Sequence, residues 1–161
     1  MARRKLPSHV QEALDAVPVD ESRLAPRAER LELRLPCPPV STNHLYATVM
    51  RNGKPVRVKT KPAKDYTKLV VSAMTEWRFT YGLRPPGPPY SLVIHVYPPA
   101  RREPPDTGNC IKLLEDSIFE AINKDSAEQA NDRNVEMIHI RRGEPEGAGR
   151  VLVVLTGRGS K

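Results

Sequence analysis

Proline is the residue that most constrains how this chain can fold. The sequence holds 17 prolines in 161 residues, about twice the usual share of roughly 5%. Most of them stand close together, in residues 36–39, 85–89, 98–99 and 104–105. Because proline fixes φ and lacks a backbone N–H, such clusters end helices and strands and stiffen the connections between them. We therefore expect short elements packed into one compact domain, which is also what the chain length allows.

The composition separates an N-terminal arm, residues 1–30, from the domain itself, residues 31–161. Within the arm, Ser8 has the spacing of a capping box with Gln11. The apolar residues that follow at helical intervals are Val10, Ala13, Leu14 and Val17. The arm is therefore expected either to form a short helix docked on the domain or to be only half ordered.

Hydrophobic patterning places strands and two main helices in the domain. The expected strands are residues 31–35, 46–50, 55–59, 90–97, 135–142 and 150–156, and the expected helices are residues 61–81 and 109–122. Asn52-Gly53 favours a tight turn between the second and third strands, and a Gly-rich loop is expected to join the last two strands as a hairpin. Helices and mostly antiparallel strands interleave, which predicts an α+β fold with a mixed or antiparallel sheet.

Charge and cysteine content limit the classes of function. The net charge of +7 favours a nucleic-acid partner. The N-terminus lacks the apolar run of a signal peptide, and no stretch approaches the roughly 18 apolar residues of a membrane span. Cys37 and Cys110 are far apart in the sequence, so we expect a cytoplasmic protein with reduced thiols and no membrane contact. A nucleotide cofactor is not expected, because neither a P-loop nor a G-x-G-x-x-G motif is present.

A band of positive charge runs from the expected hairpin into the first helix. Its members are Arg51, Lys54, Arg57, Lys59, Lys61, Lys64 and Lys68. Such a band suits the phosphates of DNA, and the interleaved Tyr46 and Tyr66 suit contacts with sugars or bases. The alternative is an ordinary solvated face, although such faces usually mix both signs of charge.

The segment from Asp106 to Asp116 carries the residues best suited to chemistry. Asn109, Lys112 and Asp116 share one face of the second expected helix. Asp106 lies just before this helix, and Asp132 precedes a strand that can return beside it. Carboxylates bind hard cations such as Mg²⁺, and such a cation with a lysine stabilises charge during phosphodiester hydrolysis. The structural alternative is that Asp106 caps the helix and Lys112 pairs with Asp116.

The same segment resembles the RusA family of Holliday junction resolvases. That family carries D-x-D-N-x-x-K-x-x-x-D on a helix, and residues 106–116 read D-T-G-N-C-I-K-L-L-E-D. Residues 38–46, P-P-V-S-T-N-H-L-Y, are similar to its opening P-P-x-x-x-N-H-x-Y, and residues 97–102, Y-P-P-A-R-R, to its Y-P-P-x-R-R. Asn131-Asp132, ahead of a strand, looks like its D-D-like pair. The four motifs stand in the family's order between about Leu33 and Leu155.

The resemblance implies a role for each residue that matches a motif position. Asp106 and Asp132 match metal-binding aspartates, and Lys112 matches the lysine that acts on the scissile phosphate. Asp116 matches a supporting position and is a candidate third metal ligand. Further supporting positions and DNA contacts are matched by Asn43, Asn109, Arg101 and Arg102.

One position departs from the family motif. Gly108 stands where the family has its second aspartate, and glycine offers no ligand and weakens the start of a helix. In one interpretation another carboxylate, Asp116 or Glu103, completes the metal site and the enzyme is active. In the other, the protein binds junctions but cuts them poorly. We favour an active enzyme, because the two matching metal-binding aspartates and the lysine remain.

Residues and resemblance together predict a crossover junction endodeoxyribonuclease, a hydrolase of DNA recombination and repair. We expect a homodimer, because two matched sites suit two symmetric nicks in a four-way junction. The expected cofactor is Mg²⁺, with Mn²⁺ as a substitute, and the expected location is the cytoplasm of a bacterium or of a phage-infected cell. The rival is a non-catalytic DNA-binding protein on the same scaffold, and a third alternative is a basic domain that contacts other proteins.

Overall fold

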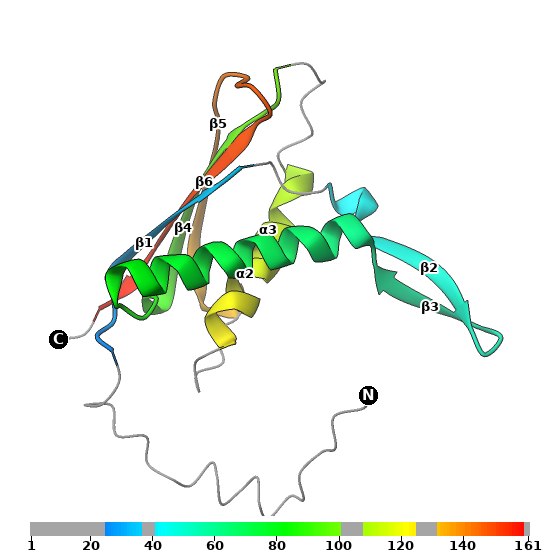
Figure 1. Ribbon diagram of the computed structural model, residues 1–161, viewed down its shortest axis with the longest axis horizontal. Helices are drawn as coiled ribbons and strands as arrows, with labels where there is room; N and C mark the ends of the chain where they lie inside the picture. The colour runs from blue at the N-terminus through cyan, green and yellow to red at the C-terminus, as the bar shows by residue number, and fades with distance from the viewer. Residues whose placement is uncertain (1–24, 37–40, 101–107, 125–131, 160–161) are drawn as a thin grey trace, which may run out of the picture.

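Both helices cover one face of a four-stranded sheet, and a separate hairpin extends beyond the helical layer (Figure 1). The computed structural model describes residues 25–36, 41–100, 108–124 and 132–159. The elements are β1 (Arg30–Leu35), η2 (Thr42–His44), β2 (Tyr46–Arg51), β3 (Lys54–Lys59), α2 (Lys61–Tyr81), β4 (Gly87–Tyr97), α3 (Gly108–Asn123), η3 (Asp132–Asn134), β5 (Val135–Arg142) and β6 (Arg150–Arg158). This arrangement confirms the α+β class. None of the described helices is long and apolar enough to cross a membrane.

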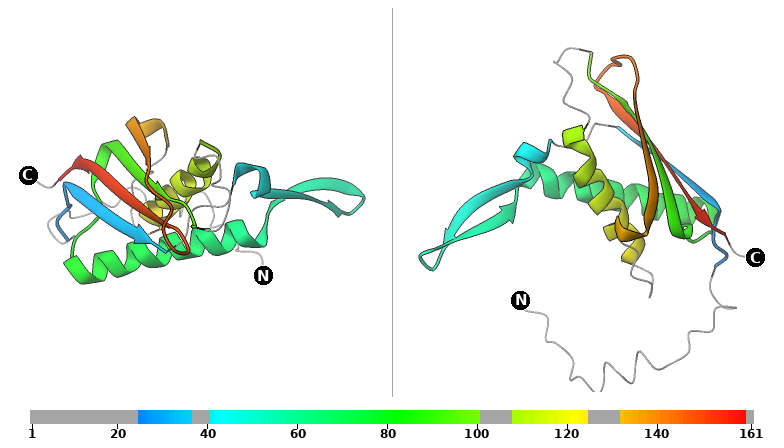
Figure 2. Two further views of the ribbon diagram at one scale, coloured as in Figure 1. Left: turned by 90° about the horizontal axis from the view of Figure 1, so that it is seen from above. Right: turned by 180° about the vertical axis from the view of Figure 1, so that it is seen from behind.

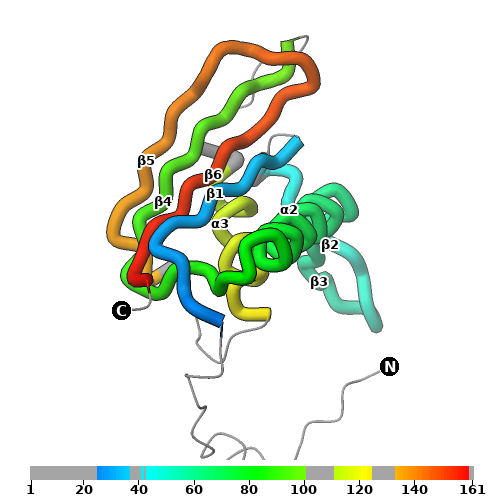
Figure 3. Tube along the Cα trace, turned by 60° about the vertical axis from the view of Figure 1, so that its left-hand side comes forward, coloured from blue at the N-terminus to red at the C-terminus, as the bar shows by residue number. Residues whose placement is uncertain are grey.

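The sheet is mixed and has the strand order β1-β6-β4-β5 (Figure 3). β4 is parallel to β5 and antiparallel to β6, and β6 is antiparallel to β1. The prediction that the last two strands form a hairpin is therefore wrong, because β4 lies between β5 and β6. Their connection, residues 143–149, is longer than a tight hairpin loop and crosses the end of β4. There the Gly143 N–H donates to the Val96 carbonyl, and the Glu146 N–H donates to the Pro98 carbonyl.

β4 begins earlier than the proline clusters predicted. The strand starts at Gly87 and includes Pro88 and Pro89, although proline clusters were expected to end strands. The register between β4 and β6 shifts between Gly87 and Ser91. The two prolines thus lie in an irregular stretch, where the ladder does not require their missing N–H groups.

The sequence signals for α2 and for the hairpin are confirmed. Thr60 caps α2, and its hydroxyl accepts a hydrogen bond from the Ala63 N–H at 3.4 Å. Gly82 ends the helix with a φ of 63°. Asn52 and Gly53 join β2 to β3 with φ values of 51° and 74°, the positive values that this type of tight turn requires.

α2 and α3 pack against each other and against the sheet around one apolar core. The hydroxyl oxygens of Thr67 on α2 and Ser117 on α3 lie 3.0 Å apart, and both residues are buried. Apolar residues surround this pair, among them Val70, Leu114 and Ile118. Each hydroxyl also donates to a carbonyl oxygen of its own helix, Thr67 to Ala63 at 3.1 Å and Ser117 to Leu113 at 2.6 Å, so both buried hydroxyls are satisfied where the two helices touch.

We predict that Gly157→Ala destabilises the domain by about 1–3 kcal/mol, the usual cost of overpacking. A methyl group on Gly157 would collide with the Gly87 carbonyl oxygen of β4, a backbone atom that cannot move aside as a side chain can. Urea denaturation followed by circular dichroism measures the change. Gly159→Ala is the control, because its methyl group would meet mainly the Glu29 side chain. Equal stability of Gly157→Ala and the wild type would contradict the close approach of β4 and β6.

Candidate functional site

The η2 turn connects the hairpin, α2 and α3. η2 packs against α3 and against β2. The Thr60 hydroxyl donates to the His44 carbonyl at 2.7 Å, and the Thr60 N–H donates to the Leu45 carbonyl at 2.9 Å. Leu45 is buried in the core, whereas Asn43 and His44 are exposed. Two residues of the opening motif therefore lie on the surface beside the helix that carries Lys112.

Lys112 and Asp116 share the solvent side of α3, as the helical spacing predicted. Lys112 Nζ lies 2.9 Å from Asp116 Oδ1, and the two side chains are 50% and 33% exposed. Leu114 and Ile118, on the opposite face of the helix, are fully buried. The structure thus confirms the ion pair between Lys112 and Asp116 that the structural alternative predicts. An exposed pair with this spacing is worth only about 0.3–0.5 kcal/mol, so a phosphate or a divalent cation can displace one partner at little cost.

The basic band is exposed along the hairpin and the first turns of α2. The hairpin extends away from the sheet and helices in every view (Figures 1 and 2). All members of the band are exposed except Lys59, which is half-buried. The Arg57 guanidinium lies over the Tyr46 ring, 4.4 Å from its centroid. Lys59 Nζ lies 3.7 Å from Glu120 Oε2 on α3, so the band reaches the helix of Lys112.

The prediction that Tyr66, which lies among the residues of this band, contacts DNA is wrong. Tyr66 is only 5% exposed and belongs to the core, so it cannot stack on a base. The helical period explains this, because Tyr66 falls on the same face of α2 as Ala63 and Val70, which are fully buried. Tyr46 is 38% exposed at the root of the hairpin and remains available for such a contact.

η3, the turn of Asp132, lies beside the C-terminal half of α3. Phe119 of α3 packs on Tyr90 of β4, with ring centroids 5.5 Å apart. Tyr90 is opposite Val135 in the pairing of β4 with β5, and Val135 directly follows η3. Lys112 lies near the other end of α3, which has 16 residues and is therefore about 24 Å long. η3 and the start of α3 thus stand toward opposite ends of one helix (Figure 2).

Several of the predicted site residues lie outside the described residues. These are Asp106, Arg101, Arg102 and Glu103, and for Asn109 and Asp132 the structure describes the backbone alone. α3 begins at Gly108, the position that departs from the motif. Within the described ranges, no three His, Cys, Asp or Glu side chains form a group that could hold a metal ion. The described residue that fits a hard cation is Asp116, a partly exposed carboxylate on a basic surface.

β5 exposes apolar side chains that the sequence pattern does not mark as exposed. Met137 is 51% exposed, Ile138 40% and Ile140 38%. Ile138 and Ile140 are opposite Leu92 and Ile94 of β4. They therefore lie on the sheet face that the helices cover elsewhere. Apolar and polar residues alternate along a strand in the same way whether or not a helix covers its apolar face. The sequence pattern therefore does not predict that these side chains are exposed.

Comparison with known proteins adds no family assignment. No model of a known protein family matches the chain, and no curated protein sequence matches it. The function is therefore inferred from the residues themselves and from their arrangement.

Proposed function

We propose that this protein is a metal-dependent endonuclease that resolves four-way DNA junctions. The observation that carries the proposal is the contact of η2 with α3 at the root of the basic hairpin. That contact sets an exposed Asn-His turn beside the helix of Lys112 and Asp116. The basic band, which would bind phosphates, is therefore continuous with Lys112 and Asp116, which suit phosphodiester chemistry. The net charge of +7 supports a nucleic-acid partner.

Lys112 would act on the scissile phosphate. Its side chain is half-exposed, and an i,i+4 ion pair such as the one with Asp116 is typically worth about 0.3–0.5 kcal/mol, so this pair hardly opposes turning toward a phosphoryl oxygen. In that position the ammonium group stabilises the negative charge that grows on the phosphate as water attacks. Asp116, released from the pair, is then available as an oxygen ligand or as a hydrogen-bond acceptor.

The proposed cofactor is Mg²⁺, which takes oxygen ligands. Asp106, Asp132 and Asp116 are the residues that would hold it. When bound, Mg²⁺ would neutralise charge on the phosphoryl group and make a water molecule more acidic. Mn²⁺ also prefers carboxylate ligands and is the expected substitute.

A homodimer would bring the two halves of this site together. Within one chain, η3 and the start of α3 stand toward opposite ends of a helix about 24 Å long. β5 follows η3 directly, forms an edge of the sheet and exposes Ile138 and Ile140. Two copies that pack through β5 about a two-fold axis would hold η3 at the interface, near the partner's α3. Each site would then combine Lys112 of one protomer with the partner's Asp132.

We predict that the double variant Ile138→Lys and Ile140→Lys is a monomer with little nicking activity. Burying a charged side chain in place of an apolar one at an interface is strongly unfavourable. Sedimentation equilibrium measures the oligomeric state, and circular dichroism checks the fold. Met50→Lys is the control, because Met50 is 67% exposed on the hairpin, away from β5. A double variant that remains dimeric would exclude this face of β5 as the interface.

A non-catalytic junction-binding protein is the second candidate, and Gly108 is the observation that favours it. Gly108 opens α3 at the motif position where the resemblance expects a metal ligand. A metal shell that lacks this ligand would bind Mg²⁺ more weakly. This candidate predicts selective binding of four-way junctions without metal-dependent cuts, and cuts that appear in Gly108→Asp.

A nicking assay on a synthetic four-way junction and a matched linear duplex tests the proposal. It is run with Mg²⁺, with Mn²⁺ and with a chelator, beside the Asp106→Asn variant. We expect symmetric, metal-dependent cuts in the junction alone, lost in Asp106→Asn. Junction binding without cuts under every metal condition would favour the second candidate.

The salt dependence of binding tests the role of the hairpin. Each lysine or arginine that contacts a phosphate adds about 0.9 to the slope of log affinity against log salt. The double variant Lys54→Ala and Arg57→Ala should therefore reduce that slope by about 2, as measured by fluorescence anisotropy. The matched control is Arg30→Ala with Arg34→Ala on β1, where both arginines pair with Glu32. An equal loss in both double variants would mean that the hairpin has no special role.

A further inference from the structure

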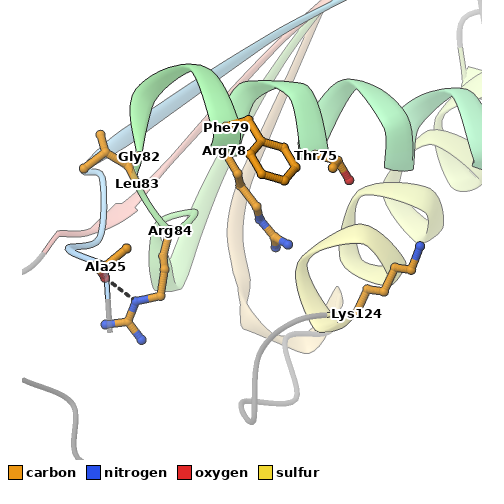
Figure 4. A pocket seen from close by; sticks show the side chains of 8 residues that line it. All are labelled: Ala25, Thr75, Arg78, Phe79, Gly82, Leu83, Arg84 and Lys124. Atoms are coloured by element: carbon orange, nitrogen blue, oxygen red, sulfur yellow. Dashed lines mark hydrogen bonds between the residues drawn. The ribbon is translucent and has the colours of Figure 1, made fainter. Parts of the chain in front are cut away.

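A pocket of about 510 Å³ opens between the C-terminal ends of α2 and α3 (Figure 4), at the end of α2 that lies away from the basic hairpin (Figure 1). Phe79 and Leu83 supply its apolar lining. Phe79 is 86% exposed, the most exposed of the large apolar side chains in the described residues. Covering a phenylalanine fully is worth about 1.5–3 kcal/mol. Binding of a partly apolar segment in this pocket would therefore be favourable, because the segment would cover Phe79.

Three cations surround this apolar lining. They are Arg78, Arg84 and Lys124. Arg78 donates to the carbonyl oxygens of Ala121 and Ile122 at the end of α3, at 3.2 and 3.3 Å. Its position is therefore fixed, and the exposed Lys124 adds a second positive charge at the pocket. A segment that binds here should be apolar on one side and acidic on the other.

The N-terminal arm leaves the domain at this pocket. Ala25 lines it, and its carbonyl oxygen accepts a hydrogen bond from Arg84 Nε at 2.6 Å. The Arg84 N–H donates to the Pro26 carbonyl, and the Ala28 N–H donates to the Arg84 carbonyl. Residues 25–28 are thus held along the chain that follows α2. The residues that precede Ala25 must start from the edge of the pocket.

The sequence of the arm has the complementary chemistry. Residues 6–22 contain four acidic residues and neither lysine nor arginine, in a chain whose net charge is +7. The acidic residues are Glu12, Asp15, Asp20 and Glu21. Val10, Leu14 and Val17 recur at helical spacing in the same segment. A connection over residues 18–24 reaches up to about 23–25 Å when extended, enough to turn back onto a pocket that begins at Ala25.

We propose that residues 8–17 of the arm dock in this pocket of their own chain. Leu14 and its apolar neighbours cover Phe79, and the acidic side chains of Glu12 and Asp15 face the three cations. Docking also places this acidic segment at the far end of the helical layer from the hairpin, where it does not compete with DNA phosphates for the basic band. The inference is independent of the proposed nuclease activity.

Hydrogen exchange of the full-length protein, read by mass spectrometry of peptic fragments, tests the docking. Amides of residues 10–17 should exchange at least about tenfold more slowly than in a synthetic peptide of residues 1–24, as expected for a locally ordered segment. The protection should be lost in Phe79→Ala and in Leu14→Asp. It should persist in the control Tyr81→Ala, because Tyr81 is 62% exposed but does not line the pocket. Unchanged exchange of the α3 fragments verifies that each variant folds.

Three results would overturn the proposal. Exchange of residues 10–17 at the rate of the free peptide would show that the arm does not dock. Protection that survives Phe79→Ala would place the arm elsewhere on the molecule. Protection that disappears on dilution would assign the pocket to the arm of a second copy rather than to the arm of the same chain.

Discussion

A mixture of the Asp106→Asn and Asp132→Asn variants is expected to nick a four-way junction that neither variant nicks alone. In the proposed dimer, each site takes the start of α3 from one protomer and η3 from its partner, because the two stand toward opposite ends of α3 within a chain. A mixed dimer then has one site with both aspartates and one site with neither. Random exchange makes about half of the dimers mixed, so about a quarter of the sites should be active.

A second mixture supplies the control for this result. Asp106 precedes α3 by two residues in the sequence and Lys112 lies in its first turns, so the proposed site takes both from the same chain and a mixed dimer of Asp106→Asn and Lys112→Ala has one defect in each site. Two differently tagged chains, isolated together, verify that exchange has occurred. If the first mixture nicks the junction and the second does not, the site is shared between the two protomers. Inactivity of both mixtures, in verified mixed dimers, would contradict it and place all catalytic groups within one chain.

Lys112→Ala is expected to slow nicking by roughly 10²–10³, the usual effect of removing one donor from a developing negative charge. Its effect on stability should be small, because the exposed pair with Asp116 contributes only about 0.3–0.5 kcal/mol. Binding of the junction should change little, since the basic band remains. Single-turnover nicking with saturating enzyme separates the rate of the chemical step from binding.

Glu120→Gln is the matched control for Lys112→Ala. It removes another ion pair of α3, in which Glu120 Oε2 lies 3.7 Å from Lys59 Nζ, and it leaves Lys112 in place. We expect nicking by Glu120→Gln within a few-fold of wild type. If Lys112→Ala also nicked at the wild-type rate, Lys112 would be only a partner for Asp116, as the structural alternative holds.

Local signals in the sequence predicted the elements that depend on a few neighbouring residues. Thr60 and Gly82 mark the ends of α2 because capping depends on side chains and φ values within one turn. Asn52-Gly53 predicts the β2–β3 hairpin for the same reason. The face that Lys112 and Asp116 share follows from the helical period alone.

Features that depend on distant parts of the chain were not predictable in this way. The insertion of β4 between β5 and β6 is decided by which strands fill the centre of the sheet, not by the loop that joins them. Tyr66 is buried because α2 turns that face to the core, although its neighbours in sequence are basic. The position of Asp132 relative to Lys112 depends on where η3 joins the sheet. The spacing of residues along the sequence carries no information on how far η3 lies from Lys112.

Cleavage of a supercoiled plasmid that extrudes a cruciform is the most direct test of the central claim. A paired cut across the junction converts the plasmid to a linear product, whereas a single nick relaxes it, reabsorbs the cruciform and leaves an open circle. We predict a Mg²⁺-dependent linear product, which is absent with chelator, with Asp106→Asn and with a plasmid that lacks the inverted repeat. An intact supercoiled plasmid in the presence of Mg²⁺ and Mn²⁺, under conditions in which the protein binds the cruciform, would contradict the assignment as a junction-resolving endonuclease.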